Sequence, residues 1–257
     1  MDDFFSRSEA LLGAEAMDAL QKKHVIIFGV GGVGSWCAEA LVRTGLMHLT
    51  IVDDDVVQAS NVNRQLPATR ETIGRPKVEA LRERLLAINP KAEIIALQKR
   101  YEAQMENGKW RMENEDFPLE GYDYIIDAID DVPAKTDLIL YASRVRGLKI
   151  FSSMGAALRF DPTKVTIGEL MDIKGDTLAK AVRARMKRIG VKPYKKIRCV
   201  YSTEQGKPLP TSPEGKEKIK GSLMQVTAVF GCTLASLVIK DIMSGTPNWG
   251  STQDITS

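Results

Sequence analysis

The chain of 257 residues has only three cysteines, and no two of them form a Cys-x-x-Cys pair. Cys37, Cys199 and Cys232 are odd in number and widely spaced, which is typical of reduced thiols and argues against a disulfide framework. The lack of paired cysteines also excludes a structural zinc site of that kind. We therefore expect a cytoplasmic protein whose fold depends on neither disulfides nor zinc.

Long apolar runs are also missing, because no window reaches the roughly 18 apolar residues that a membrane-spanning helix needs. The longest apolar tract, 224–239, is interrupted by Gln225, Thr227, Gly231, Thr233 and Ser236. Residues 1–5 are acidic where a secretory signal would be basic. These absences predict a protein without a membrane span or a secretory signal.

Short apolar runs alternate with segments of helical periodicity. The runs predict strands at 24–28, 49–52, 92–97, 124–127, 149–152 and 165–168. The periodic segments predict helices at 8–22, 35–44, 78–88, 135–146 and 226–242. Strands separated by helices imply right-handed crossovers. The expected fold class is therefore α/β, a doubly wound, mostly parallel Rossmann-like sheet with helices on both faces.

The rhythm changes near residue 155, which suggests two parts of one domain. We expect a nucleotide-binding part at 1–160 and a smaller basic part at 161–257 that continues the same domain. Residues 206–221 are rich in Pro, Gly, Ser and Lys and predict a mobile loop. The last dozen residues are polar and predict a frayed end.

The glycine-rich segment from Gly29 to Gly34 follows the first predicted strand and opens a helix. Gly29 permits a tight turn, Gly31 and Gly32 let the backbone approach phosphates, and Gly34 lets helix and strand pack closely. The helix N-terminus then meets the negative charge, and Asp53, at the end of the next strand, accepts hydrogen bonds from a ribose. These residues predict a nucleotide site, but a nicotinamide dehydrogenase would look the same here.

Four further residues favour ATP over a nicotinamide. Transfer of an adenylyl group needs cations around the triphosphate, for which Arg64, Lys77 and Arg7 are candidates, and a carboxylate for Mg²⁺, for which Asp130 is the candidate. Hydride transfer needs no such set. Taken singly, Arg64 and Lys77 could be solvated surface charges. Asp130 could instead cap the helix that starts near Pro133.

The combined pattern resembles the ubiquitin-activating-enzyme superfamily. The residues that carry the resemblance are Gly29, Gly31, Gly32, Gly34, Asp53, Asp55, Asn61, Asn63, Arg64, Gln65, Lys77, Asp127 and Asp130. The resemblance implies that Asp53 holds the ribose, that Arg64 and Lys77 hold phosphates, and that Asp130 binds the magnesium ion. It further implies that Asp55, Asn61 and Gln65 line the ATP site. Arg7 matches an arginine that reaches the site from the partner subunit of a homodimer.

Within this superfamily the chain lacks the two zinc-binding cysteine pairs of most sulfur-carrier adenylyltransferases. It instead resembles the tRNA threonylcarbamoyladenosine dehydratase family in the segments 7–13, 31–36, 125–130 and 199–204. That resemblance implies a tRNA partner, whose anticodon loop carries the threonylcarbamoyl group to be adenylated. The sequence does not identify a sulfur-transfer partner. An activator of a ubiquitin-like sulfur-carrier protein is the alternative, and an RNA-binding scaffold without ATP turnover is a non-enzymatic one.

Residues 177–203 contain no acidic side chain. A helix here would bury Ala179, Val182, Met186 and Ile189 and leave a positive surface. A surface of one sign repels itself unless a polyanion offsets it, which favours nucleic acid over a solvated face or a membrane surface. The candidate contacts are Arg183, Arg185, Lys187, Arg188, Lys192, Lys195, Lys196 and Arg198, and Lys180 belongs to the same run.

Cys199 lies beside Arg198 and near two lysines, which would lower a thiol pKa if the side chains are close. A covalent thioester at Cys199 is therefore conceivable. We favour a half-buried strand cysteine, because the expected reaction needs no thiol.

Overall fold

The six apolar runs predicted as strands, together with a seventh strand at Arg198–Ser202 that was not among the predicted runs, form one seven-stranded sheet. The computed structural model describes residues 3–102, 105–106, 109–110, 117–206 and 220–245. The strands of the sheet are β1 (His24–Phe28), β2 (His48–Val52), β3 (Glu93–Leu97), β6 (Tyr124–Asp127), β7 (Lys149–Ser153), β8 (Val165–Glu169) and β9 (Arg198–Ser202). Their order is β3-β2-β1-β6-β7-β9-β8, and only the β8–β9 pair is antiparallel. The predicted mostly parallel sheet is therefore confirmed.

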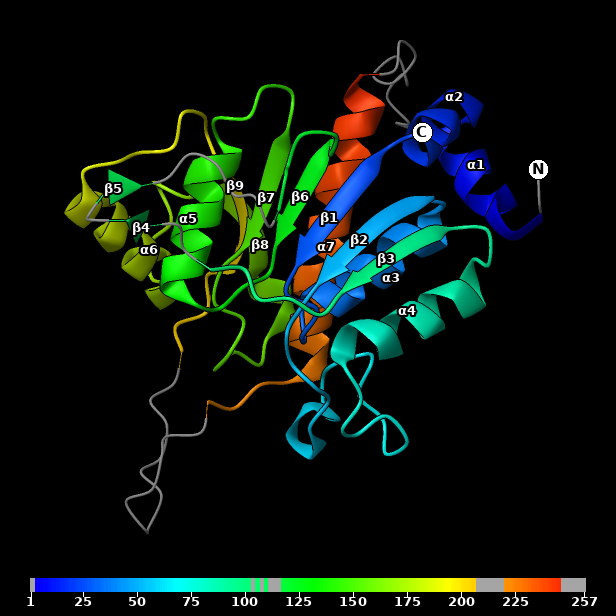
Figure 1. Cartoon of the computed structure of the whole chain (residues 1–257), viewed down its shortest axis with the longest axis horizontal. Coiled ribbons are helices and arrows are strands. Elements are labelled where there is room, and N and C mark those ends of the chain that lie inside the picture. Colours follow the sequence, from blue (N-terminus) through cyan, green and yellow to red (C-terminus); the bar gives the residue numbers. More distant parts are fainter. Residues whose placement is uncertain (1–2, 103–104, 107–108, 111–116, 207–219, 246–257) are drawn as a thin grey trace, which may run out of the picture.

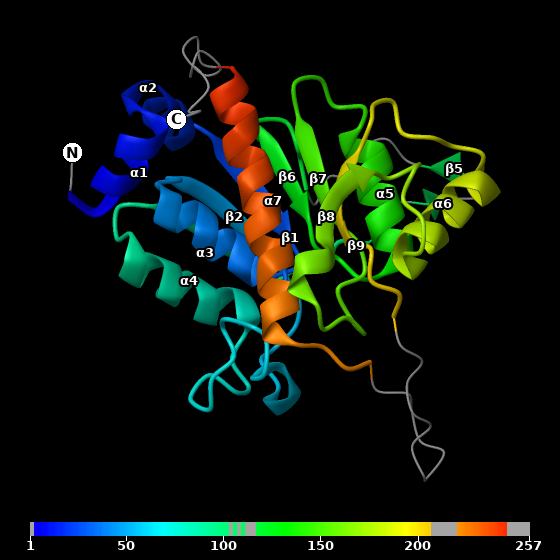
Figure 2. The ribbon, with the colours of Figure 1, turned by 180° about the vertical axis from the view of Figure 1, so that it is seen from behind.

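Helices cover both faces of this sheet, as Figures 1 and 2 show from opposite sides. The helices are α1 (Ser6–Leu12), α2 (Ala14–Gln21), α3 (Gly34–Thr44), α4 (Lys77–Ile88), α5 (Val132–Ala142), α6 (Thr177–Ile189) and α7 (Met224–Ser244). Successive side chains of a strand point to opposite faces. Val25 and Ile27 accordingly pack with α3 and α7, whereas Ile26 and Phe28 pack with α5.

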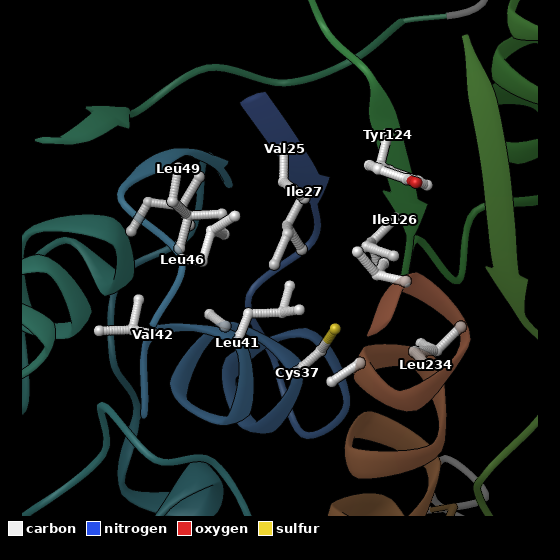
Figure 3. Packing of buried hydrophobic residues seen from close by; sticks show 14 of the residues in the cluster. Val25, Ile27, Cys37, Leu41, Val42, Leu46, Leu49, Tyr124, Ile126 and Leu234 are labelled. Atoms are coloured by element: carbon white, nitrogen blue, oxygen red, sulfur yellow. The ribbon is translucent and has the colours of Figure 1, made fainter. Parts of the chain in front are cut away.

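The larger core lies between the sheet and the helices α3 and α7 (Figure 3). Gly231 of α7 permits this contact, because a side-chain carbon there would lie 2.5 Å from the Val33 carbonyl oxygen. The helix α7 is long and apolar enough to cross a membrane, but the buried core helix of a soluble protein meets the same criteria of length and composition. The side chains of Phe230, Leu234 and Val238 are fully buried against the domain.

Two predicted helices have different bounds in the structure. The segment 8–22 divides into α1 and α2 at Gly13, whose positive φ of 83° is accessible to glycine and interrupts the helix. The segment 135–146 begins earlier, because Asp131 caps α5 by accepting the Ala134 N–H and Pro133 suits its first turn. The two-stranded hairpin of β4 (Met105–Glu106) and β5 (Lys109–Trp110) was not predicted from the sequence.

The sheet continues across residue 160, since β9 pairs with β7 and β8 lies outside β9. The basic segment forms α6 and packs on α5. As expected, the α6 side chains of Ala179, Val182 and Met186 are buried, while Ile189 is partly buried. Most of the loop predicted at 206–221 and the polar end from residue 246 lie outside the described residues.

The strand order reverses beside β1, where the chain first runs to β2 and β3 and later returns to β6 on the other side. In open α/β sheets, ligands bind at the carboxyl ends of the strands at such a switch point. The glycine loop after β1 and the turn after β6 both lie at this point.

Candidate active site

The glycine loop contains two kinds of glycine. Gly29 has φ 87°, and a side-chain carbon there would lie 2.7 Å from the Ala128 carbonyl oxygen. A side-chain carbon at Gly34 would overlap the Gly29 carbonyl group. At Gly31, by contrast, the nearest heavy atom to such a carbon would be Gln65 Nε2, at an ordinary 3.6 Å. The fold therefore requires glycine at 29 and 34, whereas at position 31 a side-chain carbon would meet only an ordinary contact, so packing does not explain the glycine there.

Asp53 closes β2 beside this loop and is already tied to the backbone. One carboxylate oxygen accepts the Val30 N–H at 2.8 Å, and the other accepts the Asp55 N–H at 3.0 Å. Burial raises the pKa of Asp53 above its usual value, although Lys77 and the two N–H donors oppose this. Asp53 thus shapes the loop and presents a carboxylate at the expected ribose position.

Lys77 opens α4 and points back to the end of β2. Its side chain is only 6% exposed, and its Nζ donates to Asp55 at 2.6 Å and lies 3.9 Å from Asp53. The Lys77 N–H also donates to the Asp55 carbonyl oxygen at 3.0 Å. A solvated surface lysine is therefore the wrong interpretation of Lys77. Asp55 holds this ammonium group beside the glycine loop.

Arg64 lies next to Gly32, where a side-chain carbon would be 3.4 Å from Arg64 Cγ. Its backbone is fixed by Trp36 of α3, whose indole N–H donates to the Arg64 carbonyl oxygen at 3.0 Å. The guanidinium donates to Ser60 O and to Asn63 Oδ1, both at 2.9 Å. The structure thus brings Arg64, Lys77 and Asp53 around one loop, as the sequence predicted.

Gln65 and Asn61 differ in how their amides are used. Asn61 is buried, and its side-chain oxygen accepts the Gln58 N–H at 3.0 Å, so it supports the turn η2 (Ala59–Asn61). Gln65 is 8% exposed, and its side-chain oxygen is buried without a hydrogen-bond partner among the described residues. An unpaired buried acceptor is costly. The Nε2 atom of the same amide, rather than this oxygen, faces Gly31, so Gln65 lies beside the glycine loop as expected.

Asp130 follows β6 and is exposed, and its carboxylate meets neither a cation nor a hydrogen-bond donor within the described residues. The alternative that Asp130 caps the next helix is wrong, because Asp131 caps α5 instead. A free carboxylate at the switch point fits the donor set of a magnesium site.

Asp127 turns out to be part of a buried ion pair that the sequence did not indicate. Its Oδ2 accepts from Lys135 Nζ at 2.7 Å and from the Ser152 hydroxyl at 2.5 Å, and neither charged side chain is exposed. Asp127 Oδ1 accepts the Ile129 N–H at 3.1 Å. This pair therefore anchors the turn that carries Asp130.

Arg7 does not join this site within one chain. It lies exposed on α1, and Figures 1 and 2 place α1 near the amino-terminal end of β1, away from the glycine loop at the other end of the strand. An Arg7 that acts in catalysis must therefore reach another subunit's site.

Cys199 is fully buried in β9 rather than half-buried. Burial raises the pKa of the Cys199 thiol to about 12, even though the charge of Lys135 acts to lower it. The thiolate is the nucleophilic form of cysteine. The geometry therefore argues against a thioester at Cys199.

The predicted nucleic-acid residues divide into two groups. Arg183 donates to Leu170 O at 2.7 Å, Lys195 donates to Leu148 O, and Lys196 lies 3.5 Å from Glu169. Burial lowers the pKa of Lys195. The remaining members are exposed or partly exposed, namely Arg185, Lys187, Arg188, Lys192 and Arg198. They extend along one flank of the molecule, from α6 to the start of β9.

The sequence matches the ThiF family over residues 5–253. The chain belongs to the ThiF family. A relative named tRNA threonylcarbamoyladenosine dehydratase, from Bacillus subtilis, is 39% identical over 200 residues, which cover 78% of this chain and 74% of the relative. The sulfur carrier protein ThiS adenylyltransferase of Escherichia coli is 40% identical, but over only 38% of this chain and 41% of its own length.

The crystal structure of the E. coli tRNA N6-threonylcarbamoyladenosine dehydratase in complex with ATP has the same architecture. It is 33% identical to this chain and superimposes with a TM-score of 0.81, covering 94% of each chain. The ThiF-family fold thus extends through the basic flank and α7, whereas the ThiS adenylyltransferase matches less than half of the chain.

Proposed function

We propose that this chain is an ATP-dependent tRNA threonylcarbamoyladenosine dehydratase. The observation that carries the proposal is the set of groups at the switch point: a glycine loop in which packing does not require Gly31, the held cations Arg64 and Lys77, the Asp53 carboxylate and the free Asp130 carboxylate after β6. The extent of the similarity to dehydratases supports the tRNA substrate. A sulfur-carrier adenylyltransferase is less well supported, since its match covers less of the chain.

The proposed reaction has two steps. An oxygen of the threonylcarbamoyl carboxylate attacks the α-phosphorus of ATP, and pyrophosphate leaves with the electrons of the broken P–O bond. The carbamoyl group of the same substrate then attacks the activated carbonyl carbon and gives up a proton to solvent, which closes a ring and expels AMP carrying the former carboxylate oxygen. The substrate loses one water in total. Catalysis then depends on positioning and on charge stabilisation rather than on a protein nucleophile.

The residues at the switch point have matching roles. Arg64 and Lys77 neutralise the phosphates, and Asp55 keeps Lys77 in place. Asp53 accepts hydrogen bonds from the ribose, and the Gln65 amide, whose Nε2 faces Gly31, lines the nucleotide site. Asp130 would hold Mg²⁺, which, when bound, offsets charge on the departing pyrophosphate.

The exposed cations of α6 and of the segment that follows it would contact tRNA. Lys187, Arg188 and Lys192 are free to meet phosphates, whereas Arg183 and Lys195 contribute mainly to the fold. The helix α6 starts near the carboxyl end of β7, where its cap residue Asp176 accepts the Gly155 N–H. The basic surface along α6 therefore begins at the edge of the sheet that carries the nucleotide site and runs away from it. A tRNA is long enough to use both. Such a substrate agrees with a cytoplasmic location.

We propose that the active form is a homodimer. Phe4 and Leu11 are 77% and 82% exposed on the same N-terminal segment as Arg7. Exposed apolar side chains of this size are typical of an interface. Docking of this segment on a second copy would bury them and could bring Arg7 to the partner's triphosphate.

The decisive experiment is the reaction itself. Incubation of the protein with ATP, Mg²⁺ and threonylcarbamoyladenosine-containing tRNA, followed by digestion and mass spectrometry, should reveal a nucleoside that has lost one water, with AMP formed in equal amount. Arg64→Ala and Lys77→Ala should abolish the product while tRNA binding and folding persist. Pyrophosphate exchange that depends on a carrier protein's C-terminal glycine, and not on tRNA, would instead favour the sulfur-carrier function. Binding of tRNA with no use of ATP would favour a scaffold.

A further inference from the structure

Arg159 is a buried cation that no described residue neutralises. It lies in the segment that follows β7 and is 6% exposed, and its buried Nε atom has no hydrogen-bond partner among the described residues. The nearby carboxylate of Glu204 is used by the backbone, because it accepts the Phe160 and Asp161 N–H groups at 3.1 and 3.0 Å. Burial of an unpaired charge destabilises a fold, so such a residue needs another reason to be there.

The backbone around Arg159 is arranged to hold this guanidinium. Leu158 has φ 62° and is the one non-glycine residue with a positive φ in the described part of the chain. For a large side chain this conformation is strained, and such strain is found mostly at functional sites. A side-chain carbon at Gly206 would overlap Arg159 Nη1, so glycine at 206 leaves room for the group.

The position of Arg159 relates it to the nucleotide site. The Leu158 N–H donates to the Gly221 carbonyl oxygen at 2.9 Å, and the next carbonyl, that of Ser222, accepts from Asn63 Nδ2 at 2.9 Å. Asn63 in turn accepts from Arg64. Arg159 therefore lies at the same carboxyl edge of the sheet as the nucleotide groups, but on the β7–β9 side rather than the β1–β2 side.

We propose that Arg159 binds an oxyanion of the RNA substrate, opposite the ATP phosphates. A guanidinium donates two parallel hydrogen bonds to a carboxylate or a phosphate, and its own unpaired N–H groups gain partners at the same time. Two sources share this chemistry, the carboxylate of the threonylcarbamoyl group and a backbone phosphate of the anticodon loop. The assignment rests on the proposed function, because it takes the modified tRNA as the substrate.

The test compares Arg159→Gln and Arg159→Lys with the wild type in binding assays that need no turnover. For Arg159→Gln, the affinity for modified tRNA should fall at least tenfold while the affinity for ATP stays within twofold of wild type. Arg159→Lys should recover part of the loss. Arg82→Gln, which removes an arginine charge from α4, is the matched control and should behave like wild type.

An unmodified transcript of the same tRNA distinguishes the two sources. If Arg159 binds the carboxylate, Arg159→Gln weakens only the modified tRNA; if it binds a phosphate, both RNAs weaken equally. Thermal unfolding supplies the check against a structural role, because removal of an unpaired buried charge should leave the Tm unchanged or raise it. A lower Tm with unchanged tRNA affinity for Arg159→Gln would overturn the proposal. Failure of the wild type to form the dehydrated nucleoside would reject the proposed function without changing these binding results.

Discussion

Lys135 and Asp127 form an ion pair with no solvent exposure beneath the turn that carries Asp130. Removal of one partner of such a pair leaves an uncompensated buried charge. We therefore expect Lys135→Met to lower the free energy of unfolding by about 3–5 kcal/mol. Urea denaturation measures this change.

The double variant Asp127→Asn with Lys135→Met is the control for this effect. It removes both charges, so its unfolding free energy should lie closer to wild type than that of Lys135→Met alone. Equal losses in the single and double variants would contradict a coupled pair. Because the same pair anchors the turn after β6, both variants should also weaken catalysis.

At the residue scale, the sequence located the charged residues of the glycine-loop motif better than the buried charges outside it. Asp53, Lys77 and Arg64 could be placed because a known loop motif fixes their order along the chain. Lys135 could not, since lysine is almost never fully buried and nothing local marks it. Arg159 has the same difficulty. Burial of a charge is decided by tertiary packing, which a single sequence does not display.

At the element scale, glycine substitutions in the loop between β1 and α3 can distinguish effects on stability from effects on ATP binding. A side-chain carbon at Gly34 would overlap the Gly29 carbonyl group, while at Gly31 it would meet only ordinary contacts. We expect Gly34→Ala to lower the Tm strongly. Gly31→Ala should keep the wild-type Tm but lose at least tenfold in ATP affinity, as isothermal titration would measure. Normal ATP binding by a folded Gly31→Ala variant would contradict the proposal that the nucleotide binds against this loop.

The helix α6 offers a second prediction at this scale. Lys187 and Arg188 are exposed, so Lys187→Gln with Arg188→Gln should weaken tRNA binding without affecting ATP binding. Each lost phosphate contact lowers the slope of log affinity against log salt concentration by about 0.7–0.9. Binding measured over a range of salt concentrations gives that slope. An unchanged slope would show that α6 does not touch the RNA, and Arg82→Gln serves as the charge control.

The predicted element boundaries were correct where a single local signal marked them, and they were wrong where the apolar periodicity disagreed with a glycine or a helix cap. The strand β1 and the helix α3 appeared as predicted, because an apolar run and a glycine loop delimit them. The periodicity of 8–22 suggested one helix, but Gly13 interrupts it. For α5, the Asp131 cap starts the helix at Val132, a few residues ahead of the start at 135 that the apolar periodicity predicted.

At the scale of the whole molecule, the topology was predictable because parallel strands with helical crossovers allow few arrangements. The proposed association of two copies was not predictable in this way, since it would depend on surfaces that meet only in an assembly. Arg7 illustrates this: only the resemblance implies a role for it at the partner's site, and the single chain places α1, which carries it, away from the glycine loop.

A mixing experiment tests the dimer directly. Arg7→Ala and Lys77→Ala should each be inactive alone, because every site would lack either the partner's Arg7 or its own Lys77. In a heterodimer, the Arg7→Ala chain keeps its own Lys77 and receives Arg7 from the Lys77→Ala chain, so one of the two sites is complete. Random exchange of subunits in a twofold dimer should therefore restore about a quarter of the wild-type activity. Mixtures that stay inactive while mass photometry detects heterodimers would mean that Arg7 does not act across the interface. Activity of Arg7→Ala alone would mean that it is not needed at all.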